Sequence, residues 1–187
     1  MSLNMEIFHA INGLAYKSNA LDSFMIFSSK YLPYIFALTI IAIFLIGIVK
    51  RDINYRKMAV STIVFTIINL IISFLIGVFY YSPRPFVHNK VNLLYYHAAD
   101  TSFPSDHATA SMSIALGFGM FNKFIGCIFT VLSVLIGISR VYVGHHYPTD
   151  VIGAYIIVII TSILYNKFLK EFVINTYEKI ENIIIKK

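Results

Sequence analysis

The sequence has little charge, a single cysteine and no tryptophan. Asp, Glu, Lys and Arg make up 13% of its 187 residues, about half the share of an average soluble domain. Hydrophobic residues make up 58%, and the mean hydropathy is +0.74. A lipid core offers the backbone no hydrogen-bond partners, so a chain of this composition is expected to cross the membrane as helices. The composition argues against a soluble globular protein and predicts an all-α, polytopic membrane helical bundle.

The single cysteine excludes an intrachain disulfide, and the placement of the basic residues argues against nucleic-acid binding. Cys127 has no second cysteine with which to form an intrachain disulfide. Residues 1–20 contain no basic segment followed by an apolar core, so we expect no cleavable signal peptide. The net charge of +6 is compatible with nucleic-acid binding, but the basic residues cluster between apolar segments, as cytoplasmic membrane anchors do. We therefore expect no nucleic-acid partner.

Five apolar segments approach the roughly 20 residues needed to cross a bilayer: Leu32–Val49, Met58–Tyr81, Ser105–Phe121, Phe124–Ser139 and Val151–Leu169. Residues 1–30 mix apolar residues with scattered charges, and we expect one or two interfacial helices between positions 3 and 29. Residues 170–187 carry apolar residues at helical spacing, typical of a cytoplasmic amphipathic tail. The prediction is one membrane-embedded domain covering residues 1–187.

The basic residues divide unequally between the two sides that five spans would create. Ten of the fifteen fall on one side: Lys50, Arg51, Arg56, Lys57, Lys123, Lys167, Lys170, Lys179, Lys186 and Lys187. The positive-inside bias makes that side cytoplasmic. The loop 82–104 and the turn 140–150 then share the extracytoplasmic side, where we expect the functional site.

Three polar clusters interrupt the apolar chain at the outer ends of the spans: SPRPF (82–86), SFPSDHA (102–108) and SRVYVGHHYPTD (139–150). Ionisable residues at membrane depth are costly and usually functional. One arginine alone is as readily a snorkelling anchor. Arg84 and Arg140 together, on the side that the charge bias depletes, offer two forked donor groups suited to a phosphate.

The residues before His107 predict the start of a helix. Ser105 or Asp106 is a good N-cap, and the free N–H groups of a helix N-terminus also bind phosphate oxygens. These two roles are compatible. A histidine at a helix start is by itself more often structural than catalytic.

The stretch HHYPTD (145–150) predicts a second helix start, with Pro148 at the first helical position and Tyr147 as the cap. Asp150 then falls at the third helical position, from which a carboxylate reaches back over the cap. There it can accept the Nδ1 proton of His146 and leave Nε2 as a nucleophile or base. The alternative is a metal site, which needs about three or four ligands and has as candidates His88, His97, His145 and His146.

Taken together, the motifs resemble a known family. The pattern S-R, five residues, H, three residues, D in SRVYVGHHYPTD, with PSDH (104–107) and RP (84–85), resembles the type 2 phosphatidic acid phosphatase superfamily. The extended HAADTSFPSDH (97–107) and the overall size are most similar to the bacterial undecaprenyl-diphosphatases associated with bacitracin resistance. The resemblance implies hydrolysis of a polyprenyl diphosphate lipid without metal or cofactor. It also implies a phosphohistidine intermediate and a site on the extracytoplasmic face of a bacterial plasma membrane.

The resemblance also implies the roles of individual residues. His146 would attack phosphorus, Asp150 would orient it, and His107 would protonate the leaving oxygen. The substrate-binding residues would be Arg84, Pro104, Ser105, Asp106 and Arg140.

Two positions depart from the family pattern. Gly77 stands where the family has the lysine of its first motif, and Lys90 is a candidate substitute. Asp106 replaces the usual glycine, and we expect it to cap the helix or to hold an arginine.

Two other functions stay open at this point. One is a phosphatase acting on phosphatidate or phosphatidylglycerol phosphate. The other is a channel or transporter that uses intramembrane charges. The second is disfavoured because the spans show no paired halves and the polar residues gather at one face.

Overall fold

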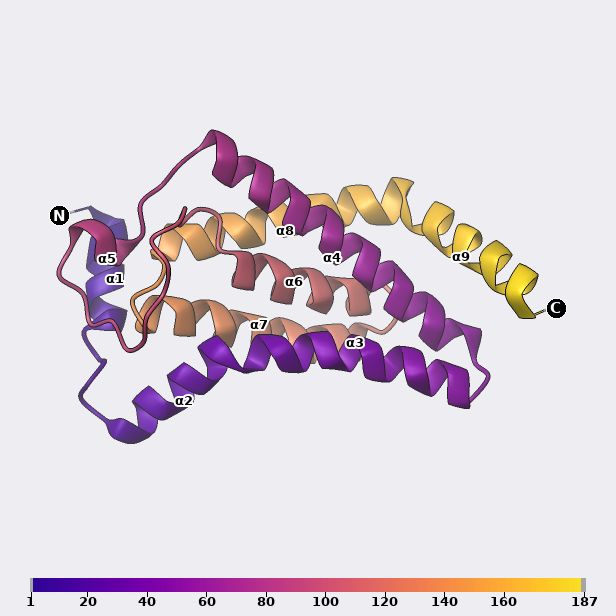
Figure 1. Cartoon of the computed structure of the whole chain (residues 1–187), viewed down its shortest axis with the longest axis horizontal. Coiled ribbons are helices and arrows are strands. Elements are labelled where there is room, and N and C mark those ends of the chain that lie inside the picture. The colour runs from indigo at the N-terminus through magenta and orange to yellow at the C-terminus, as the bar shows by residue number, and fades with distance from the viewer. Residues whose placement is uncertain (1, 186–187) are drawn as a thin grey trace.

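The computed structural model describes residues 2–185 as nine helices, without β-strands in that part of the chain. In chain order they are α1 (Leu3–Asn12), α2 (Asn19–Lys30), α3 (Leu32–Val49), α4 (Ile53–Phe79), α5 (Pro85–His88), α6 (Asp106–Gly119), α7 (Lys123–Tyr142), α8 (Pro148–Phe168) and α9 (Lys170–Ile185). The long helices lie along one common direction (Figure 1). The predicted all-α membrane bundle is confirmed. Of the predicted tail, Lys186 and Lys187 lie outside the described residues.

Four of the five expected spans form helices long and apolar enough to cross a membrane, namely α3, α4, α7 and α8. The fifth differs from the expectation, because α6 has 14 residues and is therefore only about 21 Å long. A bilayer core is about 30 Å thick. Figure 1 shows α6 in the middle of the bundle, among the longer helices. A short helix suits this place because its neighbours shield it from lipid.

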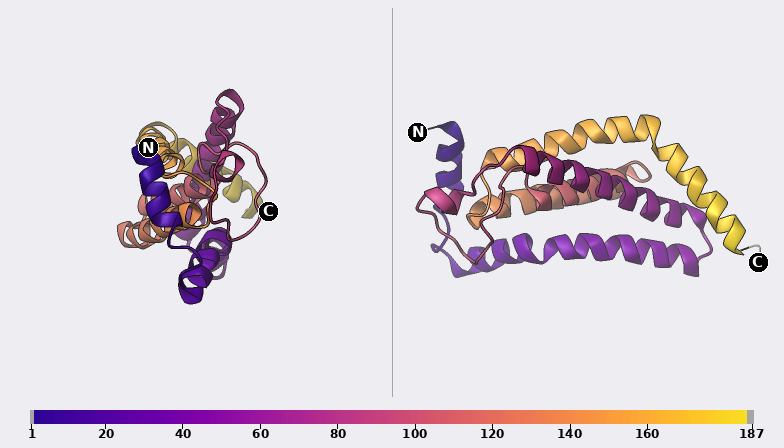
Figure 2. Two further views of the ribbon diagram at one scale, coloured as in Figure 1. Left: turned by 90° about the vertical axis from the view of Figure 1, so that its left-hand side faces the viewer. Right: turned by 45° about the horizontal axis from the view of Figure 1, so that its top comes forward.

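The N-terminal residues form two helices that lie differently. α1 runs across one end of the bundle, whereas α2 leads through Tyr31 directly into α3 (Figure 2, right). The orientation of α1 is that of an interfacial helix, and its place in the membrane interface stays a prediction. At the other end α9 turns away from α8 and is joined to α4 by the ion pairs Arg56–Glu181 and Lys57–Glu178.

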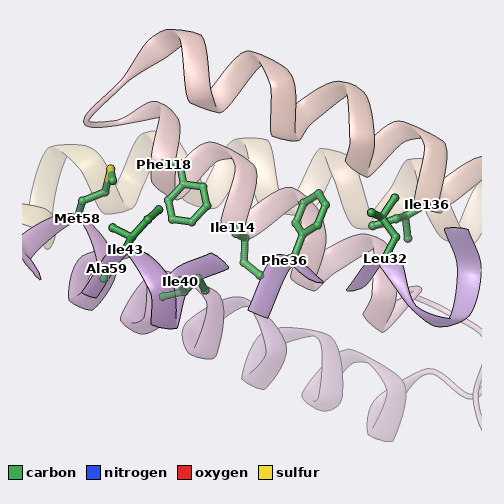
Figure 3. Close-up of a cluster of buried hydrophobic side chains, with 9 residues drawn as sticks. All are labelled: Leu32, Phe36, Ile40, Ile43, Met58, Ala59, Ile114, Phe118 and Ile136. Atoms are coloured by element: carbon green, nitrogen blue, oxygen red, sulfur yellow. The ribbon is translucent and has the colours of Figure 1, made fainter. Parts of the chain in front are cut away.

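The largest apolar cluster joins α3, α4, α6 and α7 (Figure 3): Leu32, Phe36, Ile40, Ile43, Met58, Ala59, Ile114, Phe118 and Ile136. Small residues allow close approach beside it. A Cβ on Gly126 of α7 would lie 2.4 Å from the Cα of Gly119 on α6, so the two backbones touch there. Close packing through small residues is how membrane helices associate, since lipid tails are as apolar as the side chains.

The helices bring the three polar clusters to one end of the bundle. The segment between α4 and α6, the turn between α7 and α8, and α1 all lie at this end in Figure 1. The turns α3–α4 and α6–α7, together with α9, lie at the other end. The expectation that residues 82–104 and 140–150 share one side is therefore confirmed, while the side of the membrane they face stays a prediction.

Candidate active site

Arg84 connects the first polar cluster to the third. It immediately precedes α5, and its side chain is 5% exposed. Its Nε donates to Asp100 Oδ1 at 2.6 Å, and its Nη1 donates to the carbonyl of His145 at 3.1 Å. The same Nη1 lies 2.9 Å from Nε2 of His146. One guanidinium therefore holds two segments that are 62 positions apart in the chain.

This contact fixes the tautomer of His146. A guanidinium only donates hydrogen bonds, so Nε2 must be the nitrogen without a proton. Nδ1 carries the proton and donates it to the carbonyl of Ser102 at 2.9 Å. Burial first, and then the charges of Arg140 and Arg84, lower the pKa of His146 well below its ordinary value. His146 is therefore a neutral imidazole with a lone pair on Nε2, the form that a nucleophile requires.

Asp150 supports His146 less directly than the sequence predicts. Its Oδ2 accepts the N–H of Tyr147 at 2.8 Å and the hydroxyl of Ser102 at 2.5 Å. The reach back over the helix start is thus as predicted. The same oxygen lies 3.6 Å from Nδ1 of His146, too far for a hydrogen bond. The predicted direct bond is not formed, because the carbonyl of Ser102 occupies the direction of the Nδ1 proton.

Arg140 and Ser105 present buried polar atoms without protein partners. Arg140 is 1% exposed, and its Nη1 donates to Ser29 Oγ at 3.1 Å and to Tyr95 Oη at 3.0 Å. Its Nε and Nη2 have no partner within the described residues, nor does Ser105 Oγ. Ser105 is at the N-cap position of α6, yet its hydroxyl caps no N–H. Native proteins rarely leave buried donors unpaired, so these groups mark a place for an anion.

His107 lies in the first turn of α6 and is half-buried. A charge on His107 lowers the pKa of His146, so the two imidazoles are close enough to interact electrostatically. Pro104 is buried just before the helix start. The structure thus gathers His107, His146, Arg84, Arg140 and Ser105 at one end of the bundle.

Comparisons with known proteins identify the family of the chain. The model of the family described as PAP2 superfamily matches residues 54–173, more than half of the chain. The chain belongs to the PAP2 superfamily.

This PAP2 chain is similar to two relatives and to one solved structure of another protein over nearly its whole length. It is 40% identical to the undecaprenyl-diphosphatase BcrC of Bacillus subtilis, over 99% of this chain and 97% of the relative. It is 28% identical to the bacitracin transport permease protein BcrC of Bacillus licheniformis, over 98% of this chain and 91% of the relative. The crystal structure of LpxE from Aquifex aeolicus matches with a TM-score of 0.76 and 27% identity, over 90% of this chain and 97% of that one.

The departures from the PAP2 motif have local explanations. A Cβ on Gly77 would lie 2.8 Å from Cγ2 of Thr101, so the threonine already fills the space beside this position. Lys90 is exposed, and no hydrogen bond or ion pair joins it to the site within residues 2–185. Asp106 neither caps a helix nor holds an arginine as expected. Its Oδ1 accepts the hydroxyl of Ser73 at 2.7 Å, which ties the start of α6 to α4.

His145 holds the surrounding loop. Its ring is fully buried, and Nε2 donates to the carbonyl of Tyr95 at 3.0 Å. Its centroid is 4.3 Å from that of Tyr95 and 4.7 Å from that of His97, while His88 is exposed. Within the described part of the chain, His, Cys, Asp and Glu side chains form no group of three or more that could hold a metal ion. The metal-site alternative therefore has no ligand set there.

Sequence reasoning missed three residues of this PAP2 site: Ser102, Ser29 and Tyr95. Ser102 lies inside a cluster that the sequence singles out, but its role depends on a carbonyl reaching a histidine 44 positions away. Ser29 and Tyr95 also bond to each other at 2.8 Å, and both hold Arg140. Neither residue has a local sequence signal, because a serine in an N-terminal helix and a tyrosine in an aromatic loop are ordinary features of a membrane protein.

Proposed function

We propose that this chain is an integral membrane phosphatase that hydrolyses undecaprenyl diphosphate to undecaprenyl phosphate and inorganic phosphate. One observation carries the proposal: His146 has its lone pair on Nε2, 2.9 Å from Nη1 of Arg84. The charge of Arg140 also acts on His146, and the Nε and Nη2 donors of Arg140 are unpaired within the described residues. The 40% identity to an undecaprenyl-diphosphatase over nearly the full length supports this substrate. Such an activity recycles the cell-wall lipid carrier and confers resistance to bacitracin.

In the first half-reaction the terminal phosphoryl group binds to Arg84, Arg140 and Ser105. Arg84 transfers its Nη1 hydrogen bond from Nε2 of His146 to a phosphoryl oxygen, which frees the lone pair. Nε2 attacks phosphorus, and the bond from phosphorus to the bridging oxygen breaks. The negative charge of the bound phosphate favours the protonated form of His107. His107 gives this proton to that oxygen, so undecaprenyl phosphate leaves and a phosphohistidine remains. The Asp150 carboxylate, 3.6 Å from Nδ1, stabilises the positive charge that develops on the ring.

In the second half-reaction water cleaves the phosphohistidine. His107, now neutral, accepts a proton from the water as its oxygen attacks phosphorus. The bond between phosphorus and Nε2 breaks, and inorganic phosphate leaves with the same two arginines still neutralising its charge. His146 recovers its lone pair, and His107 is again protonated for the next turnover.

The proposed place of catalysis is the extracytoplasmic face of a bacterial plasma membrane. Lys17, Lys30, Arg84, Lys90 and Arg140 belong to segments at, or leading from, the end of the bundle that carries the site. Of the other ten basic residues, eight belong to the α3–α4 turn, the starts of α4 and α7, the end of α8 and α9, while Lys186 and Lys187 lie outside the described residues. This asymmetry supports a cytoplasmic position for the opposite end.

Two other functions are alternatives to this one: hydrolysis of a different lipid phosphate, and transport. Phosphatidate and phosphatidylglycerol phosphate also present a terminal phosphoryl group to the same residues. Transport is the second, because the relative in Bacillus licheniformis is named a bacitracin transport permease. The buried arginines Arg84 and Arg140 lie at one end of the bundle and do not follow a path across it, which favours hydrolysis.

The deciding experiment measures phosphate release by the purified protein in the presence of EDTA. We expect a higher kcat/KM for undecaprenyl diphosphate than for phosphatidate or phosphatidylglycerol phosphate, and inhibition by vanadate. With substrate labelled in its terminal phosphate, rapid quenching should trap an acid-labile phosphoenzyme that His146→Ala lacks. Preference for phosphatidate would reassign the substrate. Movement of bacitracin across proteoliposomes without phosphate release would replace hydrolysis by transport.

A further inference from the structure

A cavity lies at the end of the bundle opposite the candidate active site. Its volume is about 680 Å³, and it is bounded by the end of α6, the first turns of α7 and the last turns of α8. Figure 1 shows α6 between α7 and α8, and all three helices contribute residues to the lining of the cavity. Its polar lining comes from Lys123, Thr130, Ser162, Asn166 and Lys167.

The cavity follows from how the three helices pack. Near the active site α7 and α8 are in close contact, because Gly137 leaves room for Val151 and Tyr155. Farther along, Gly119 and Gly126 bring the backbones of α6 and α7 into contact, and both glycines line the cavity. The cavity therefore lies beside this contact, where the last turns of α8 complete its lining.

The cavity is positively charged. Two of its lining residues are lysines, and none is acidic. Neither Lys123 nor Lys167 forms an ion pair within the described residues. The ammonium of Lys167 lies 5.1 Å from the ring centroid of Phe168, a contact that leaves its charge uncompensated.

The helix ends around the cavity contribute partial charges of both signs, because α7 begins there while α6 and α8 end there, so the two lysines give the cavity its net positive field. α7 begins at Lys123, so its free N–H groups contribute partial positive charge. The C-terminus of α6 would contribute the opposite sign, but Lys170 donates to the carbonyl of Met120 at 3.3 Å and offsets it. An anion is the ligand that this end of the bundle favours.

We propose that this cavity binds the phosphate headgroup of an anionic phospholipid. A lipid fits better than a soluble anion because the same cavity has apolar walls, including Leu116 and Ile163. Ile163 is 63% exposed on a helix long enough to cross the membrane, so an acyl chain can lie against it while the headgroup reaches the lysines. Basic pockets between membrane helices are known to hold such headgroups on the cytoplasmic side. The proposal does not depend on which lipid the active site hydrolyses.

The only cysteine of the chain makes the test direct, because Cys127 lines this cavity and is exposed. The rate of its alkylation by a small maleimide is measured on the full chain in uncharged detergent, with phosphatidylglycerol or phosphatidylcholine added. We expect phosphatidylglycerol to slow alkylation about tenfold at a concentration ten times its Kd, since about one site in ten is then free. Phosphatidylcholine should have little effect.

Charge variants identify the cause of the protection. Lys123→Gln/Lys167→Gln should weaken phosphatidylglycerol protection by about 25-fold in Kd, at about fivefold for each lysine. The matched control Lys50→Gln/Lys179→Gln removes two exposed charges from the same end of the molecule and should change nothing. Lys123→Arg/Lys167→Arg keeps the charge and should retain the protection, which separates loss of binding from misfolding.

Three outcomes would overturn the proposal. One is equal protection by phosphatidylcholine, which would mean that apolar contact alone covers Cys127. Another is undiminished protection in the Lys123→Gln/Lys167→Gln variant with an unchanged alkylation rate in the absence of lipid. The third is equal protection by inorganic phosphate at the same concentration, which would make the cavity a site for soluble anions.

Discussion

At the scale of single residues, the reactivity of His146 depends on two hydrogen bonds from distant segments. Arg84 donates to Nε2 at 2.9 Å, and the carbonyl of Ser102 accepts the proton of Nδ1 at 2.9 Å. The first keeps the lone pair on the nitrogen that faces the arginine, and the second fixes the ring orientation. In the absence of substrate the arginine also covers that lone pair, so a bound phosphoryl group must draw the arginine away before attack.

The two histidines proposed to be catalytic should differ in how far their loss depends on the leaving group. His146→Ala removes the nucleophile and should abolish the phosphoenzyme with any substrate. His107→Ala removes the general acid, typically worth about 10²–10⁴-fold. The His107 defect should be smaller on undecaprenyl diphosphate than on phosphatidate, because a phosphate leaves more easily than an alkoxide.

Phosphate release by both variants on both lipids checks this assignment. An equal His107→Ala defect on the two lipids would mean that this residue does not protonate the leaving group. Phosphoenzyme formation by His146→Ala, together with its loss in His107→Ala, would exchange the two roles.

In a serine-protease triad, replacing the aspartate lowers kcat by about 10⁴-fold, because the histidine then adopts the wrong tautomer. Replacing Asp150 should lower kcat by less. Here the carbonyl of Ser102 holds the Nδ1 proton, so the tautomer persists in Asp150→Asn. We expect a decrease in kcat of about 10–100-fold, from lost charge stabilisation and a weakened helix start. Ser102→Ala keeps the carbonyl and should lose less. A 10⁴-fold loss in Asp150→Asn would show that the carboxylate itself fixes the tautomer.

Protein stability should fall in mild acid because two buried histidines are neutral. Burial, and secondly the charge of Arg140, lower the pKa of His145, as burial and the two arginines do for His146. The unfolded chain takes up these protons near pH 6.5, whereas the folded chain does not. Stability is therefore full above about pH 6.5 and decreases below it, by at most about 1.4 kcal/mol per pH unit for each histidine.

Thermal unfolding midpoints of the purified protein between pH 7.5 and 5 test this effect. His145→Gln can still donate to the carbonyl of Tyr95. This variant should make the unfolding midpoint less dependent on pH, because the contribution of His145 is removed. His88→Gln is the control, because His88 is exposed. An unchanged slope in His145→Gln would mean that His145 does not contribute.

At the scale of helices, the short α6 is the element around which the others pack. It carries Ser105 and His107 at its start, and its last turn touches α7 through glycine. α7 carries Arg140 at its far end. The register between α6 and α7 therefore helps to set the position of Arg140 relative to His107.

Two glycines at this contact should respond differently to alanine. A Cβ on Gly126 would meet the Cα of Gly119 at 2.4 Å and its N at 2.9 Å, and backbone cannot yield as a side chain can. We expect Gly126→Ala to destabilise the protein by about 1–3 kcal/mol and to lower activity. Gly119→Ala is the matched control, since its Cβ would lie 3.6 Å from Gly126, an ordinary contact. Thermal unfolding in detergent compares the two, and equal losses would contradict a contact of this tightness.

At the scale of the whole molecule, the bundle has two chemically different ends. One gathers the buried arginines and histidines, and the other carries exposed lysines and the ion-paired α9. The division matches the charge bias of the sequence, which predicts that the first end faces outward.

Cysteine labelling in intact cells tests that orientation. In a Cys127→Ser background, Lys90→Cys should react with a membrane-impermeant maleimide, and Lys50→Cys should react only after permeabilisation. Both positions are exposed, one at each end of the bundle. The reverse labelling pattern would place catalysis in the cytoplasm.

The helical fold, the four long spans and the three polar clusters of the site all follow from the amino-acid sequence. These features are local, since they depend on runs of apolar residues, on helix-start residues and on the order of motifs along the chain. The length of α6 was not predicted, because an enclosed helix can be short and still apolar.

Tertiary packing, in contrast, determines which groups complete the site. It placed the carbonyl of Ser102 on Nδ1 of His146, where the sequence predicts Asp150, and it brought Ser29 and Tyr95 to Arg140. It also filled the space beside Gly77 with Thr101 and left Lys90 exposed. The physical reason is that these contacts join segments up to 111 positions apart, so they depend on how helices pack and how a loop folds back over them, and neither is encoded by any short motif.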